Sequence, residues 1–212
     1  YRNLIELVSR ANTEGFYYKP RIDRELLKEY RKGLICLSAC IAGEVPALIL
    51  KGNIEGAEAL AKEYLEIFGP DHYYIELQDH GLPEQKEANR LLIQLAKKLG
   101  IGLVATNDLH YIDKSDGECH DVLLCIQMGK TVDDPARMKF PNNEFYLKSP
   151  GEMAQLFGAY PEALENSCEI ANRCNVNLEF GHLHLPVFPV PGGLTADDYL
   201  TQLCREKVQE RY

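Results

Sequence analysis

The sequence predicts an α/β fold in which parallel β-strands alternate with crossover helices. Residues 34–106 alternate between short apolar runs and longer segments with apolar side chains at helical spacing, in the order strand, helix, strand, helix, strand. Short runs that are apolar throughout are typical of strands buried on both faces of a parallel sheet. Strands separated by helices in this way pair in parallel through right-handed crossovers.

Two helices are expected before the sheet. Residues 3–14 carry apolar side chains at helical spacing, and Gly15 follows as a residue that can end the helix. Asp23 is suited to cap a second helix over residues 24–32.

Three strands make up the predicted sheet, at residues 34–37, 73–77 and 102–106. Asn53 is suited to cap the first crossover helix, which we expect to end at Phe68. Pro83 fits the first position of the second crossover helix, and Gly100 follows its last turn.

The remainder is predicted to be mainly helical. We expect helices over 115–128, after a capping box formed by Ser149 and Glu152, and from Pro161 to Cys174, with a short strand at 145–147. Three prolines predict an extended connector over 181–194. A second capping box at Thr195 predicts a last helix over 195–212.

Composition narrows the class of protein. The chain has 212 residues, 45% of them hydrophobic, and a formal net charge of −9. Global disorder is therefore excluded, and no apolar run approaches the roughly 18 residues of a membrane span. The acidic balance argues against binding nucleic acid over the whole surface. Since the sequence begins with Tyr rather than Met, we expect a piece of a longer protein.

The first 33 residues depart from the acidic balance. They hold eight Lys and Arg against five Asp and Glu. A solvated helix face is the favoured interpretation of this basic segment, and contact with a phosphate backbone is the alternative.

Seven cysteines are present, an odd number with no CxxC pair. This spacing excludes a zinc ribbon and a thioredoxin-like motif. With no secretory signal, it predicts a reducing, cytoplasmic setting.

The strongest candidate for chemistry is Asp108 with His110, directly after the third predicted strand. Ligands gather at the carboxyl ends of strands in parallel α/β sheets. Two residues apart in extended backbone, a carboxylate and an imidazole share a face and can converge on one cation. The alternative is an Asp that accepts backbone hydrogen bonds with the His ring packed nearby.

Cys40 follows the first strand at the same expected edge of the sheet, so its thiolate could join this cluster; the alternative is a small buried hydrophobe. His80 and Glu76, at the end of the second strand, are either part of the site or structural hydrogen-bonding groups.

Two further arrangements are disfavoured as metal sites. His182 and His184 lie in the connector with no strand before them, and Cys119, His120 and Asp121 are consecutive in a helix and point apart.

The sequence lacks the motifs that several common enzymatic activities require. The sequence has no GxGxxG after a strand, no GxSxG, and no P-loop, because Gly129-Lys130-Thr131 lacks a glycine five residues earlier. No segment presents a convincing pair of polymerase carboxylates.

Several strings in the sequence resemble those of a known family. They are Phe16-Tyr17-Tyr18-Lys19-Pro20-Arg21-Ile22, Leu37-Ser38-Ala39-Cys40, Tyr74-Ile75-Glu76-Leu77-Gln78, Val104-Ala105-Thr106-Asn107-Asp108-Leu109-His110-Tyr111 and His120-Asp121-Val122-Leu123-Leu124-Cys125-Ile126. Their order and spacing resemble the bacterial replicative C-family polymerases, the DNA polymerase III alpha subunits, in the later part of the N-terminal PHP domain.

This resemblance implies a partial, distorted PHP-type β/α barrel. Residues 1–180 would be the C-terminal portion of the PHP domain, 181–194 a Pro/Gly-rich connector, and 195–212 the first helix leading into the polymerase core. The family's ligands fall on Cys40, Asp108 and His110, for divalent ions of zinc or manganese, while the remaining ligands lie upstream. Magnesium would serve polymerisation by the parent protein.

For the parent, the resemblance implies template-directed DNA synthesis in the cytoplasm, with DNA, deoxynucleoside triphosphates and other replicase subunits as partners and no membrane. The PHP site would hydrolyse DNA 3′ ends. Two alternatives stay open: a metal-stabilised scaffold for the polymerase or a proofreading subunit, and a stand-alone PHP phosphoesterase, which the connector and the helix after it disfavour.

Overall fold

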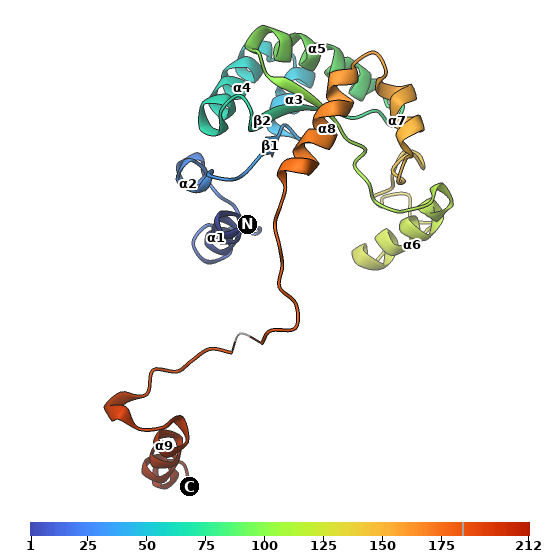
Figure 1. Ribbon diagram of the computed structural model, residues 1–212. Helices are drawn as coiled ribbons and strands as arrows, with labels where there is room; N and C mark the ends of the chain where they lie inside the picture. Colours follow the sequence, from blue (N-terminus) through green and yellow to red (C-terminus); the bar gives the residue numbers. More distant parts are fainter. Residues whose placement is uncertain (184) are drawn as a thin grey trace. The chain divides into compact units, whose positions relative to one another are not determined.

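The computed structural model describes residues 1–183 and 185–212, which divide into two compact units, Tyr1–Asn175 and Val176–Tyr212. The elements of the first unit are α1 (Arg2–Thr13), α2 (Arg24–Tyr30), β1 (Cys36–Leu37), α3 (Glu44–Leu50), α4 (Ile54–Phe68), β2 (Tyr73–Leu77), α5 (Pro83–Leu99), β3 (Gly102–Ala105), η1 (Lys114–Asp116), α6 (Gly117–Met128), α7 (Pro150–Phe157) and α8 (Pro161–Arg173) (Figure 1). The second unit contains η2 (Pro191–Gly193) and α9 (Ala196–Arg211).

The sheet is parallel, with strand order β1-β2-β3. Cys36 pairs with Tyr73, and Tyr74 pairs with Gly102. Because α3 and α4 lie between β1 and β2, and α5 lies between β2 and β3, each parallel pair is joined through helices. The prediction of an α/β fold with parallel strands and crossover helices is confirmed. The first strand is shorter than predicted and starts at Cys36.

The core is centred on β2, whose side chains are buried on both faces of the sheet. Tyr73, Ile75 and Leu77 are each at most 1% exposed. Helices α4 and α5 contact β2, and α8 contacts β3. The Asn166 amide on α8 donates a hydrogen bond to the Leu103 carbonyl of β3 at 2.7 Å, which joins this helix to the sheet. Truncating a side chain such as Ile75 to Ala in such a core costs about 2–5 kcal/mol.

Most predicted helix ends are confirmed by their capping contacts. The Asp23 carboxylate accepts from the Leu26 N–H at the start of α2, and Asn53 accepts from Gly56 at the start of α4. Gly100 ends α5 in the left-handed conformation, with φ 67°. The capping box of Ser149 and Glu152 is formed at the start of α7.

Two elements differ from the predictions. Helix α3 was not predicted, because it is only seven residues long and contains Pro46, which the first turn of a helix tolerates. The strand expected at 145–147 is instead a single bridge between Tyr111 and Tyr146.

In the second unit, the Thr195 hydroxyl accepts from the Asp198 N–H and caps α9, as predicted. No helix among the described residues of the chain has the length and apolar character that crossing a membrane requires.

Candidate functional site

The carboxyl ends of the three strands lie at one edge of the sheet, as parallel pairing requires. Ser38 follows β1, Gln78 follows β2, and Thr106 follows β3. Hydrogen bonds connect these segments: the Ser38 hydroxyl accepts from the Glu76 N–H at 2.9 Å, and the Gln78 amide donates to the Thr106 hydroxyl at 3.3 Å. A polar network therefore covers the edge where the sequence predicted the site.

The structure brings Asp108 and His110 together just beyond β3. Nδ1 of His110 lies 3.9 Å from Oδ1 of Asp108 and 2.7 Å from the Asp108 carbonyl oxygen. Because a carbonyl only accepts, Nδ1 carries the proton, so in the neutral ring Nε2 is the nitrogen with the lone pair. Both side chains are about one third exposed, at 33% for His110 and 38% for Asp108.

The backbone of this pair is not extended, contrary to the prediction. Asp108 has φ 46°, in the left-handed region that Asp tolerates better than most residues. The two groups approach one another through this turn rather than through the alternation of a strand.

Aromatic side chains hold the His110 ring in place. Its centroid lies 4.7 Å from that of Phe140, 5.5 Å from that of His120 and 5.8 Å from that of Phe145. The His110 N–H also donates to the Phe145 carbonyl at 2.9 Å. Phe140 and Phe145 were not predicted as part of the site, because Phe145 was assigned only to a short strand and Phe140 lies outside every predicted element.

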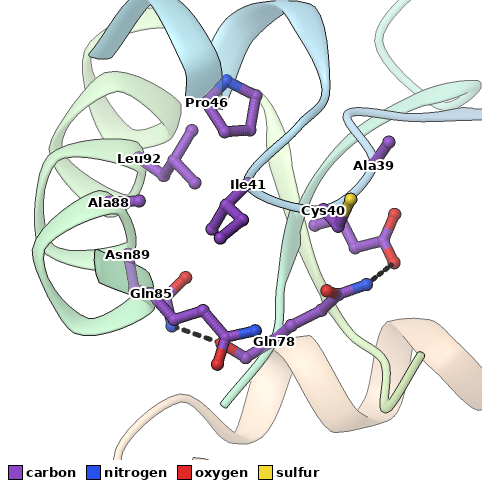
Figure 2. A pocket seen from close by; sticks show the side chains of 10 residues that line it. Ala39, Cys40, Ile41, Pro46, Gln78, Gln85, Ala88, Asn89 and Leu92 are labelled. Atoms are coloured by element: carbon purple, nitrogen blue, oxygen red, sulfur yellow. Dashed lines mark hydrogen bonds between the residues drawn. The ribbon is translucent and has the colours of Figure 1, made fainter. Parts of the chain in front are cut away.

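Cys40 lines a cavity of about 10 Å³ with Gln78 and Glu76, between the loop after β1 and helix α5 (Figure 2). That volume is comparable to a single water molecule. The Oε1 atom of Gln78 is buried and has no hydrogen-bond partner among the residues described. Cys40 thus lies at the predicted edge of the sheet, in a small cavity lined by both polar and apolar side chains.

No group of three or more His, Cys, Asp and Glu side chains in the described part of the chain is arranged to hold a metal ion. Cys40 therefore does not form a complete ligand set with Asp108 and His110. The donor chemistry of the pair nevertheless fits a divalent metal, because a carboxylate and an imidazole Nε2 are available. A metal-bound His commonly donates its other N–H to a carbonyl, as His110 does.

Glu76 acts as a hydrogen-bond acceptor within the edge network. Its carboxylate accepts from the Gln78 amide at 3.0 Å and from the Thr106 hydroxyl. Burial, and then the Glu76 charge, raise the pKa of the neighbouring Cys36 thiol to about 11.

His80 is a buried structural residue, the second of the two interpretations that the sequence allowed. It is 1% exposed, and its ring stacks on Phe145 with centroids 4.0 Å apart. Nε2 donates to the Asn107 carbonyl at 2.7 Å, so Nδ1 accepts from the Gln85 amide, also at 2.7 Å. Both nitrogens are occupied within the protein, which leaves none for a metal.

The structure describes residues 119–121, the first of the two disfavoured metal arrangements, and only His182 of the second. Asp121 is held by two hydrogen bonds from Arg137, at 2.5 and 2.7 Å, which lower the pKa of the carboxyl group, and Cys119 is exposed. Asp121 is thus engaged by a cation, whereas Cys119 lies at the surface. His182 is exposed, and its predicted partner at position 184 lies outside the described residues.

Comparison with known proteins identifies those to which this chain is related. Residues 1–80 match the model of the PHP domain family. Along its entire length the chain is 48% identical to the DNA polymerase III subunit alpha of Treponema pallidum (strain Nichols) and 48% identical to that of Thermus aquaticus. The subunit alpha of Pseudomonas aeruginosa is 43% identical. The chain is homologous to a segment of the DNA polymerase III alpha subunits.

The resemblance to the alpha subunits and to their PHP domain is thereby confirmed. The chain spans 18% of the length of each of these three relatives. The match to the PHP model includes Cys40 and stops at residue 80, before Asp108 and His110.

Proposed function

We propose that the chain is part of a replicative DNA polymerase that carries out template-directed DNA synthesis. The observation that supports this most strongly is the 48% identity to DNA polymerase III alpha subunits along the entire chain. DNA, deoxynucleoside triphosphates and other replicase subunits would be partners of the whole protein, which would act in the cytoplasm with magnesium for polymerisation. The polymerase carboxylates would belong to the rest of the protein, because no segment of this chain presents a convincing pair and the chain corresponds to 18% of those relatives.

Within that protein, we propose that Asp108 and His110, with Cys40, contribute to a divalent metal site that hydrolyses DNA 3′ ends, and zinc or manganese suits these donors. A divalent ion supplies stabilisation of negative charge on phosphate and a lowered pKa for bound water. The support from this chain is the hydrogen bond from His110 Nδ1 to the Asp108 carbonyl, which leaves Nε2 available. The His110 ring also packs against Phe140, with centroids 4.7 Å apart.

A second candidate function is a metal-stabilised scaffold without hydrolytic activity. The stand-alone phosphoesterase is disfavoured, because the relatives are much longer than this chain.

The test uses the full-length protein with Asp108→Asn, His110→Gln and Cys40→Ser, made singly. Bound metal is measured by elemental mass spectrometry, and 3′-end hydrolysis and polymerisation are measured on a primed template. We expect each variant to lose bound metal and hydrolysis while polymerisation remains.

His120→Gln is the matched control, since its ring lies 5.5 Å from that of His110 but it is not a proposed ligand. Metal content unchanged in all three variants would overturn the ligand assignment. Metal loss with no hydrolysis in the unaltered protein would favour the scaffold.

A further inference from the structure

The loop between α1 and α2 exposes three consecutive aromatic side chains. Phe16 is 59% exposed, Tyr17 64% and Tyr18 82%. Scattered exposed hydrophobic residues are normal on protein surfaces, but a contiguous set on a short loop is a recognised mark of binding surfaces. The loop lies apart from the Asp108 and His110 pair in sequence and is not needed for the proposed metal chemistry.

The loop has a defined backbone. The Tyr17 N–H donates to the Lys19 carbonyl at 3.1 Å, which closes a tight turn around Tyr18. At its base, Gly15 packs so closely that a Cβ there would lie 2.0 Å from the Arg21 carbonyl oxygen. Only glycine fits that approach, so the two ends of the loop are held together.

Tyr18 adopts the left-handed conformation, with φ 59°. This conformation is rare and unfavourable for a bulky L-residue. The turn thus places the ring in solvent at the cost of local strain, and strained residues of this kind gather at binding sites. The rings of Tyr17 and Tyr18 meet edge to face, with centroids 4.7 Å apart, so they form one aromatic surface.

The charged side chains within the loop are positive, and the acidic Glu14 and Asp23 flank it and line a pocket with Arg21. Between Phe16 and Ile22 the charged side chains are Lys19 and Arg21. Neither forms an ion pair with any residue that the structure describes, whereas the nearby Arg24 is paired with Glu44 and Glu63. The Arg21 guanidinium lies 5.3 Å from the Tyr17 ring centroid, a cation–π contact that keeps its charge beside the aromatic surface.

We propose that the loop 15–21 is a binding site for single-stranded DNA. Exposed aromatic rings stack on bases, and neighbouring Lys and Arg neutralise the phosphates. Duplex DNA is a poorer fit, because its base faces are already stacked on one another. Lys19 and Arg21 are two of the eight Lys and Arg in residues 1–33, for which a phosphate contact was the less favoured interpretation.

The test is photo-crosslinking of the full-length protein to an oligothymidylate that contains 4-thiothymidine, with the adducts mapped by mass spectrometry. We expect adducts on the peptide containing residues 16–21. Tyr17→Ser combined with Tyr18→Asn removes both rings and retains a residue that accepts the left-handed backbone. Because stacking on one aromatic ring changes affinity by about fivefold or more, adduct yield at subsaturating DNA should fall at least that much.

Phe180→Ser is the matched control, since Phe180 is 86% exposed and follows Glu179 rather than a cation. Its adduct yield in the loop should be unchanged. Tyr17→Ser is also tested alone. If its melting temperature equals that of the unaltered protein, a lower adduct yield reports lost stacking rather than lost folding. The proposal is overturned if the loop gives no adduct, if the variants keep full yield, or if a duplex of the same sequence crosslinks equally well. Failure of the metal-site proposal would leave these results unaffected, because the two tests change different residues.

Discussion

Nδ1 of His110 donates a hydrogen bond to the carbonyl oxygen of Asp108 at 2.7 Å, across a turn in which Asp108 has φ 46°. The same residue therefore offers a carboxylate beside the ring and a carbonyl that determines which ring nitrogen is protonated. The two functions of Asp108 can be separated by substitution, because Asn preserves the turn and Ala does not.

Asp108→Ala should lower the free energy of unfolding by about 1 kcal/mol, because the left-handed conformation is unfavourable for residues other than Gly, Asn and Asp. Asp108→Asn should stay within about 0.5 kcal/mol of the unaltered chain, as for other mild surface changes. Urea unfolding of the three proteins provides the measurement. Equal stability of the Ala and Asn variants would show that the turn carries no strain.

His80 and Gln85 should behave as a coupled pair. His80→Leu leaves the Gln85 amide and the Asn107 carbonyl without their partner, and an unsatisfied buried group costs about 1–3 kcal/mol. Gln85→Leu leaves the His80 ring nitrogen and the His80 N–H unpaired. The double variant should therefore lose less stability than the sum of the single losses. Additive losses in urea unfolding would contradict the hydrogen bond between the two side chains.

The sequence was sufficient to predict the three parallel strands and the caps of α2, α4 and α7. These depend on local signals, such as the Asp23 carboxylate that accepts from Leu26. It also located Asp108 and His110 together, because both follow a strand end.

The rest depends on contacts between distant segments. The role of His80 was left open, since only the fold shows that Asn107 and Gln85 lie at its two ring nitrogens. Phe140 lies outside every predicted element and Phe145 was assigned only to a short strand, so nothing local indicated that they pack on His110. The prediction of an extended backbone at Asp108 was wrong, because its φ is positive, yet the side chains of Asp108 and His110 still lie close together.

Cys36 should resist alkylation near neutral pH. Burial is the main cause that raises the pKa of its thiol to about 11, so the reactive thiolate is scarce. Cys119, Cys168, Cys174 and Cys204 are exposed and should react first. Limited treatment with iodoacetamide at pH 8, followed by peptide mass spectrometry, measures the order. Early modification of Cys36 in the folded chain would contradict its burial.

The interaction of Tyr146 with Glu152 should stabilise the chain only while the carboxylate is charged. The Tyr146 hydroxyl donates to Glu152, and this contact, with those from Ser149, lowers the pKa of Glu152 to about 2. Because the pKa is lowered in the folded state, the stabilisation is complete above the ordinary glutamate pKa of about 4.3 and is lost as the pH falls toward 2.

Tyr146→Phe removes the donor, so the variant should be less stable than the unaltered chain at pH 6, and the difference should shrink between pH 4.5 and pH 2. Urea unfolding at a series of pH values measures it. Tyr160→Phe is the control, because the Tyr160 hydroxyl has no hydrogen bond to any described residue and its removal should have no pH-dependent effect. If the stability difference for Tyr146→Phe were the same at pH 6 and pH 2, the hydroxyl would not be acting on the charged form of Glu152.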